Sequence, residues 1–136
     1  MRILALDVGT HRIGVAISDP LGITASPHST IQRNKQAVNK IAQLAKELEV
    51  GCIVVGLPLH LGGHEGRQAM DVRSFAARLI PVVAAIPVEF WDERLTTVEA
   101  EERIGHRRSR GRRKKTELDA AAAAIILESY LLEKSP

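Results

Sequence analysis

The chain has 136 residues, of which 45% are hydrophobic and 26% are charged. This size and composition suit one globular domain with a buried core, so we expect a single domain over residues 1–136. No apolar stretch approaches the roughly 20 residues of a membrane span, and the first residues resemble a strand rather than a signal peptide. We therefore expect a cytoplasmic protein without membrane contact. The lone Cys52 excludes an internal disulfide.

Basic residues are unevenly distributed along the chain. The formal net charge is only +3, yet the segment 107–115, "RRSRGRRKK", contains seven Arg or Lys residues and no acid. Such a basic block attracts the phosphate backbone of nucleic acids, although a solvated loop can have the same composition. Its density, its glycine and its position before the last helix favour contact with phosphates.

Strand patterns open the chain. Residues 2–8 and 12–18 are apolar and are separated by only three residues, which is the spacing of an antiparallel hairpin. A turn with Pro and Gly then leads to a short third strand, expected around residues 23–26.

Helix and strand patterns alternate in the middle of the chain. Between residues 34 and 48 apolar residues recur at helical spacing, and we expect Gly51 to end this helix in the left-handed conformation. A buried strand is expected at 52–58, followed by a glycine-rich loop at 60–66. The next helix is expected to end at Pro81, because proline cannot donate to the helical ladder.

The last part of the chain repeats this alternation. A fifth strand is expected within residues 86–94, and Thr96 and Glu99 form a capping-box pattern for a short helix that ends at Gly105. The final helix is expected over 116–134. A hairpin followed by strands that alternate with helices predicts a mixed sheet covered by helices, which is an α/β layered fold.

Four acids stand at strand ends or helix starts, where α/β proteins place their ligands. Asp7 interrupts an apolar strand, Asp92 and Glu93 end the fifth strand, and Asp119 lies in the first turn of the last helix. Carboxylates that are brought together repel one another unless a cation compensates, and Mg²⁺ takes oxygen ligands beside phosphate substrates. Sites with two such ions activate water and stabilise the leaving oxygen.

Each acid also has a purely structural interpretation. Asp119 could do no more than complement the helix dipole, and Asp92 and Glu93 could pair with Arg94 at the surface. Asp7 differs because its strand offers no obvious partner, and unpaired buried charges are rare. A functional role is therefore favoured most clearly for Asp7.

Four motifs in this chain resemble those of one known family in both order and spacing. They are "LDVGTHRIGVAISD", "VVGLP", "DERLTT" and "ELDAAAAAIILESYL". The chain resembles the YqgF family, also called RuvX, which comprises pre-16S ribosomal RNA nucleases and Holliday junction resolvase-like proteins. The resemblance covers essentially the whole chain. It implies a ribonuclease H-like α/β fold whose five-stranded mixed sheet, of order 3-2-1-4-5, is flanked by helices.

The resemblance also implies an activity and its residues. The family is a cytoplasmic phosphodiester hydrolase that uses Mg²⁺ or Mn²⁺ and matures the 5′ end of 16S ribosomal RNA. Its first acid matches Asp7, its DER motif matches Asp92, Glu93 and Arg94, and its C-terminal acid matches Asp119. All four acids are candidate catalytic residues. We expect Asp7, Glu93 and Asp119 to be the metal ligands, with Asp92 as the rival of Glu93.

Contact with nucleic acid is expected from polar and basic residues near these acids and from the basic block. The candidates are Thr10, His11, Arg12, Arg94, Arg107, Arg108, Arg110, Arg112, Arg113, Lys114 and Lys115.

The chain departs from the family pattern in two places. His11 stands where the family commonly has lysine, so we expect a phosphate contact there to be either weaker or dependent on pH. After "GLP" the family typically has Asn and then Asp before glycine, whereas this chain has His60 and Gly62. The metal acids are unchanged.

Other functions compete with this interpretation. A resolvase-like endonuclease would act on branched DNA instead of ribosomal precursor RNA, and the sequence does not distinguish endonuclease from exonuclease. A non-catalytic RNA-binding factor for ribosome assembly could retain the fold without the chemistry. An actin-like ATPase would need two lobes, and this chain has room for one. We expect a monomer or a weak homodimer.

The basic block leads to a testable prediction. If it contacts several phosphates, affinity for a single strand should fall with salt with a log-log slope of roughly −0.7 per contact. Replacing Arg112, Arg113, Lys114 and Lys115 by alanine should reduce this slope in a binding titration over a range of salt concentrations. An unchanged slope would remove the block from the interface.

Overall fold

The computed structural model describes residues 1–107 and 115–134, except for the side chains of residues 106, 107, 115 and 116. A five-stranded sheet of order β3-β2-β1-β4-β5 lies at its centre, as the family resemblance implied. The strands are β1 (Arg2–Val8), β2 (Arg12–Ser18), β3 (Ala25–Gln32), β4 (Val50–Leu57) and β5 (Val88–Asp92).

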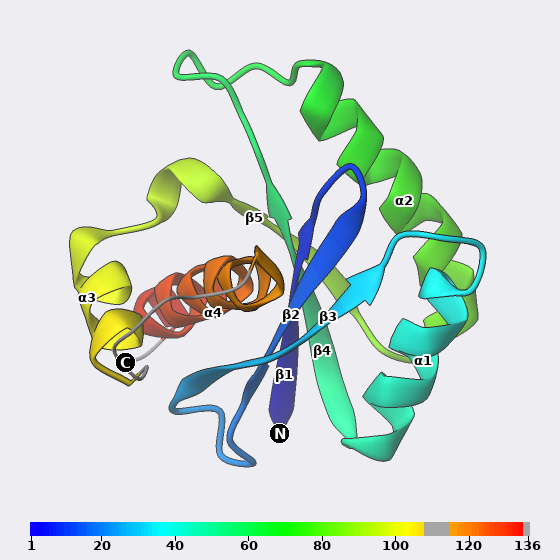
Figure 1. The fold of residues 1–136 in the computed structure, drawn as a ribbon, viewed down its shortest axis with the longest axis horizontal. Helices are drawn as coiled ribbons and strands as arrows, with labels where there is room; N and C mark the ends of the chain where they lie inside the picture. The colour runs from blue at the N-terminus through cyan, green and yellow to red at the C-terminus, as the bar shows by residue number, and fades with distance from the viewer. Residues whose placement is uncertain (108–114, 135–136) are drawn as a thin grey trace.

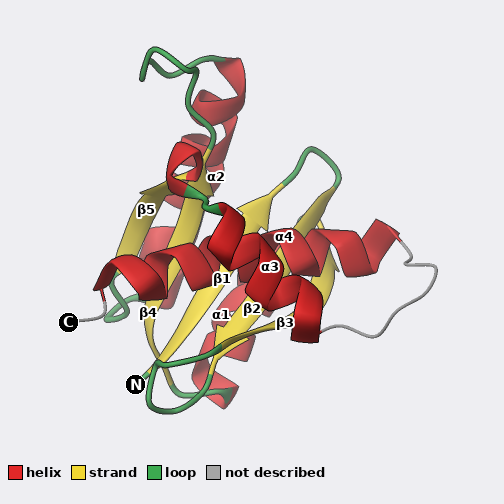
Figure 2. Ribbon diagram, turned by 90° about the vertical axis from the view of Figure 1, so that its left-hand side faces the viewer, coloured by secondary structure: helices red, strands yellow, loops and turns green. Residues whose placement is uncertain are grey.

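Helices cover both faces of this sheet (Figure 1). They are α1 (Ala37–Glu47), α2 (Arg67–Val83), α3 (Val98–Arg107) and α4 (Lys115–Lys134), with a 3₁₀ turn η1 (Glu93–Leu95) between β5 and α3. The helices α1 and α2 pack on one face, and α3 and α4 pack on the other, as the turned view also shows (Figure 2). No helix in the described part of the chain is long and apolar enough to cross a membrane.

The first three strands are antiparallel, whereas β1, β4 and β5 are parallel. The predicted hairpin is therefore confirmed. The third strand was predicted around residues 23–26, which is wrong, because β3 covers Ala25–Gln32 and pairs with the whole of β2. Its sequence is polar because it is an edge strand, and Pro27 lies where its register with β2 shifts. Cross-strand pairing rather than local hydrophobicity sets its length.

Two predicted helix ends are also wrong. Gly51 belongs to β4, and the left-handed residue after α1 is Glu49, with φ of 54°. Gly51 instead makes room for Met1, since a Cβ there would overlap the Met1 sulfur. Pro81 lies inside α2, which continues to the buried Val83. A proline so close to the end of a helix removes a single backbone hydrogen bond, and burial of the last turn outweighs that loss.

The start of α3 differs by one residue from the predicted capping box. Thr97, not Thr96, is the capping residue, and its Oγ1 accepts a hydrogen bond from the Ala100 amide at 3.1 Å. Glu99 does not reach back to the cap, because Arg103 donates to its carboxylate at 2.7 Å. The helix also continues past Gly105, to Arg107. Thr96 instead closes the 3₁₀ turn that precedes the helix.

Alternation along the strands divides the buried side chains into two cores. In β1, Leu4, Leu6 and Val8 face α1 and α2, whereas Ile3 and Ala5 face α4. Asp7 continues the second set, because successive side chains of a strand point to opposite faces. This alternation directs Asp7 toward the face that α4 covers.

The first turn of α4 lies directly against β2 at Gly14. A Cβ at this position would overlap the backbone carbonyl oxygen of Asp119, so only glycine permits the observed contact. Small residues continue the close packing, since four of the alanines that follow are buried. They are Ala120, Ala121, Ala123 and Ala124.

Replacement of Gly14 by alanine should therefore displace α4 from the sheet. We expect a loss of about 2–3 kcal/mol in the free energy of unfolding in urea, because the overlapping atoms are backbone and cannot rotate away. Gly105 is the matched control. It lies in α3, where an added Cβ would meet no atom within 4 Å, so Gly105→Ala should stabilise the chain by about 0.5–1 kcal/mol. Equal stability of Gly14→Ala and wild type would contradict the close packing.

Candidate active site

Asp7 lies at the end of β1 between two residues that have no side chain. Gly14 of β2 is its direct partner in the antiparallel pair. On the other side, Leu6 pairs with Val55 of β4, and the next residue of that strand is Gly56. The space above the sheet beside Asp7 is therefore left open for side chains that arrive from α4 and β5.

Glu93 occupies the space above Gly56. A Cβ on Gly56 would lie 3.3 Å from the Glu93 side chain and 2.6 Å from Ile126 of α4. Glu93 begins the 3₁₀ turn directly after β5, so it is placed by the point at which the strand ends. The two glycines thus give Asp119 and Glu93 access to the surroundings of Asp7.

Asp92 has a different environment from Glu93. Its carboxylate accepts hydrogen bonds from Arg94, at 2.6 Å from Nη2 and 3.1 Å from Nε, and also from the Arg94 amide at 2.9 Å. These bonds lower the pKa of Asp92 from its ordinary value, chiefly through the guanidinium. Asp92 is therefore a positioning partner of Arg94, and the pairing with Arg94 that was weighed for both acids holds for Asp92.

Burial and mutual repulsion raise the pKa of the other two acids. The pKa of Asp7 is raised first by burial and then by the negative charge of Asp119. The pKa of Glu93 is raised to about 7 by burial and then by the charges of Asp7 and Asp92. Asp7 is therefore electrostatically coupled to acids from two distant segments of the chain.

Asp119 is held by Arg12. The Nε of Arg12 lies 2.6 Å from Oδ2 of Asp119, and the two side chains are 32% and 28% exposed. The pair joins the start of β2 to the first turn of α4, 107 positions apart in the chain. Of the expected contacts to nucleic acid, Arg12 is thus already paired with one of the candidate metal ligands.

The donor set suits a hard divalent cation, because Asp7, Glu93 and Asp119 offer carboxylate oxygens. In the described part of the chain, no donor or cation bonds to the carboxylates of Asp7 or Glu93. In the same residues, however, no three His, Cys, Asp or Glu side chains are close enough together to hold a metal ion. The Asp119 carboxylate points instead toward the guanidinium of Arg12, with which it forms an ion pair. The chemistry of the three acids fits the ion, and the side-chain geometry is not that of a closed metal site.

Three other predicted contact residues lie at this edge of the sheet. Thr10 and His11 are exposed in the turn between β1 and β2. Arg94 donates to the Leu61 carbonyl at 3.3 Å, which ties it to the loop between β4 and α2. In that loop the rings of His60 and His64 stack with centroids 4.3 Å apart.

The basic block lies outside the residues whose side chains are described. This applies to Arg107, Arg108, Arg110, Arg112, Arg113, Lys114 and Lys115.

Gly14 and Gly56 are site residues that the sequence analysis missed. Both interrupt apolar strands, in "RIGVAI" and "VVGLP", and a glycine inside a strand often marks the close approach of another segment. That signal was present in the sequence. It does not tell which segment approaches, because the partner of each glycine comes from a distant part of the chain.

Comparison with known sequences gives full-length matches. A family model described as "RuvX: Holliday junction resolvase" matches residues 1–133. A protein of Syntrophomonas wolfei that carries the name "Putative pre-16S rRNA nuclease" is 42% identical over 133 residues, covering 96% of this chain and 94% of that protein. A protein of the same name from Thermoanaerobacter pseudethanolicus is 45% identical over 134 residues, covering 96% of each.

Comparison with solved structures supports the fold. The chain is similar to RuvC of Thermus thermophilus in complex with a Holliday junction substrate, with a TM-score of 0.64 and 13% identity over 99% of this chain and 97% of that one. A second RuvC structure from the same organism gives 0.63, with 98% and 96% covered. The fold is the RuvC-like form of the ribonuclease H fold.

The raised pKa of Glu93, due to burial first and to repulsion second, leads to a prediction about stability. The folded pKa of about 7 exceeds the ordinary 4.5, so the wild-type chain loses stability as pH rises from about 4.5 to 7. In EDTA, Glu93→Gln should therefore exceed wild type by up to about 3 kcal/mol in urea unfolding at pH 8 and match it near pH 4.

Asp92→Asn is the matched control for this experiment. The pKa of Asp92 is lowered, so its charge stabilises the fold and its loss should cost less than about 1 kcal/mol at pH 8. If Glu93→Gln is no more stable than wild type at pH 8, neither burial nor repulsion destabilises the Glu93 carboxylate in the folded chain.

Proposed function

Because the chain belongs to the RuvX family, we propose that it is a nuclease that hydrolyses phosphodiester bonds with the help of Mg²⁺ or Mn²⁺. One observation carries the proposal. Asp7 and Glu93 lie together without a cationic partner in the described residues, although each has a pKa raised by burial and by neighbouring acids. A protein retains such unfavourable charge where a ligand of opposite charge relieves it.

The proposed metal ligands are Asp7, Glu93 and Asp119. A divalent ion bound by these acids would activate water and stabilise the leaving oxygen of the phosphodiester. Glu93, with a pKa of about 7, is in part protonated at neutral pH and must give up that proton to act as a ligand. Asp119 must exchange its ion pair with Arg12 for the same role.

Two arginines are suited to bind the substrate backbone. Arg94 is oriented by Asp92 and by the Leu61 carbonyl, so its guanidinium is fixed in position after the end of β5. Arg12 is adjacent to the acids through Asp119 and would be available to a phosphate once that pair opens. Thr10, His11 and the basic block 107–115 complete the proposed contacts.

The proposed substrate is the 5′ end of pre-16S ribosomal RNA. Two relatives that are 42% and 45% identical to this chain, over nearly their whole lengths, carry the name "Putative pre-16S rRNA nuclease". Their name supports RNA as the substrate. The description of the matching family model favours branched DNA as the second candidate. We further propose that residues 1–136 act as one domain, in the cytoplasm, as a monomer or weak homodimer.

The first experiment is a cleavage assay. Labelled precursor 16S RNA and a four-way DNA junction are incubated with wild type, Asp7→Asn and Asp92→Asn, in Mg²⁺, Mn²⁺ or EDTA. We expect cleavage of the RNA by wild type only with metal, a loss of at least about 100-fold in Asp7→Asn because a ligand is removed, and a smaller loss in Asp92→Asn.

Each outcome distinguishes the candidate functions. Cleavage of the junction alone would transfer the proposal to DNA. Binding of RNA without cleavage in any metal would favour an assembly factor and contradict the nuclease.

A further inference from the structure

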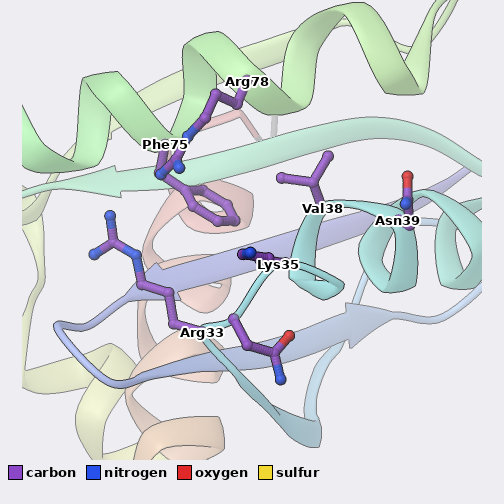
Figure 3. A pocket seen from close by; sticks show the side chains of 7 residues that line it. Arg33, Lys35, Val38, Asn39, Phe75 and Arg78 are labelled. Atoms are coloured by element: carbon purple, nitrogen blue, oxygen red, sulfur yellow. The ribbon is translucent and has the colours of Figure 1, made fainter.

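A surface groove lies between α1 and α2, on the face of the sheet opposite α4. Its cavity has a volume of about 570 Å³. Basic and amide side chains surround a small apolar floor formed by Val38 and Phe75 (Figure 3). The lining residues are Arg33, Asn34, Lys35, Val38, Asn39, Phe75 and Arg78, and none of them is acidic.

Two of the three cations in this α1–α2 groove form no ion pair. Arg33 forms a bidentate pair with Asp71, at 2.7 Å and 2.9 Å, which neutralises it and fixes its position. Lys35 and Arg78 are exposed and form no ion pair with any described residue. The groove therefore has an excess of positive charge after Asp71 is counted.

Like charges are also crowded around one aromatic ring. The guanidinium carbons of Arg33 and Arg78 lie 5.3 Å and 5.7 Å from the centroid of the Phe75 ring. Both cations gain from contact with the ring, and both lower the pKa of Asp71, Arg33 first through its hydrogen bonds and then Arg78 through its charge.

The groove is connected to the strand that carries Asp7. Nη1 of Arg33 donates to the Gly9 carbonyl at 3.0 Å, and the Arg33 amide donates to the His11 carbonyl at 2.9 Å. Gly9 is two residues beyond Asp7, a distance of about 7 Å along an extended strand. The groove and the acids therefore open at the same edge of the sheet, on opposite faces.

We propose that the α1–α2 groove binds the phosphate backbone of the substrate strand where it continues past the catalytic edge. This rests on the proposed function, because the ligand is the same strand. Lys35 and Arg78 contact phosphate oxygens, and the paired Arg33 forms the fixed wall between the groove and the turn at Gly9. The groove reads charge rather than base identity, because phosphate contacts carry no sequence information.

The polar side chains of the groove match the hydrogen-bonding groups of a phosphodiester backbone. The amide of Asn34 accepts the Gln36 amide proton through its oxygen, at 3.0 Å, which leaves its NH₂ group as the donor end. Asn39 supplies a second amide at the rim. Phosphate oxygens accept hydrogen bonds from such amides as well as from cations. The mixture of cations and amide donors without any acid is thus suited to a chain of phosphates.

Binding titrations over a range of salt concentrations test this proposal. The probe is a labelled single-stranded RNA that extends well beyond the cut, bound to Asp7→Asn protein in EDTA so that no cleavage occurs. We expect Lys35→Ala/Arg78→Ala to reduce the magnitude of the log-log slope of affinity against salt by about 1.4. Between about 50 and 200 mM salt, the loss of affinity should therefore be about sevenfold smaller in the variant than in its parent. With a short RNA that ends at the catalytic edge, the variant should match its parent.

The double variant Lys40→Ala/Lys46→Ala is the matched control. Both lysines are exposed on α1 and outside the groove, so the charge change is the same. Its slope should equal that of the parent, and all variants should remain folded at the temperature of the titration. An unchanged slope in the groove variant, or an equal loss in both double variants, overturns the proposal.

The test is independent of the nuclease proposal. The groove is judged by binding in EDTA, whereas the nuclease is judged by cleavage in Mg²⁺ or Mn²⁺. If the groove variant reduces the salt slope but the wild type cleaves no RNA, the groove proposal stands and the nuclease proposal is rejected. If the wild type cleaves RNA but the groove variant leaves the salt slope unchanged, the nuclease proposal stands and the groove proposal is rejected.

Discussion

The contact between the backbone of α4 and Gly14 is the constraint on which the candidate site depends. It brings Asp119 over the strand that pairs with Asp7, so acids from opposite ends of the chain become neighbours. Gly56 has the same effect on the other side of β1, where it admits Glu93. Glycine weakens a strand, and the chain accepts this weakness at the two positions where a side chain would exclude an acid.

Electrostatic repulsion is the consequence of this arrangement. Two of the acids at this edge have a guanidinium partner, since Arg94 compensates Asp92 and Arg12 compensates Asp119. Asp7 and Glu93 have no such partner among the described residues, and burial first and repulsion second raise their pKa values. A site built in this way lowers the stability of the fold and at the same time increases its attraction for a cation. The same carboxylates thus lower the free energy of unfolding and provide ligands for a cation.

The two faces of the sheet have different roles at one edge. The face under α4 gathers acids, whereas the face under α1 and α2 carries the cations Arg33, Lys35 and Arg78, of which only Arg33 forms an ion pair with a described residue. Arg33 connects them through the turn after β1, where it bonds to Gly9 and His11. A polyanionic strand that crosses this edge would find metal-binding chemistry on one side and neutralising charge on the other.

The sequence by itself determined the order of strands and helices, the opening hairpin and the acids worth examining, because these follow from local periodicity and from the cost of burying a charge. It could not give the extent of β3 or the place of Gly51, since pairing with β2 and packing against Met1 decide them. Only the tertiary structure distinguished the environment of Glu93 from that of Asp92 and brought Arg12 of β2 into an ion pair with Asp119 of the last helix. Those contacts join segments that are distant in the chain, and through-space distance leaves no periodic signal in a sequence.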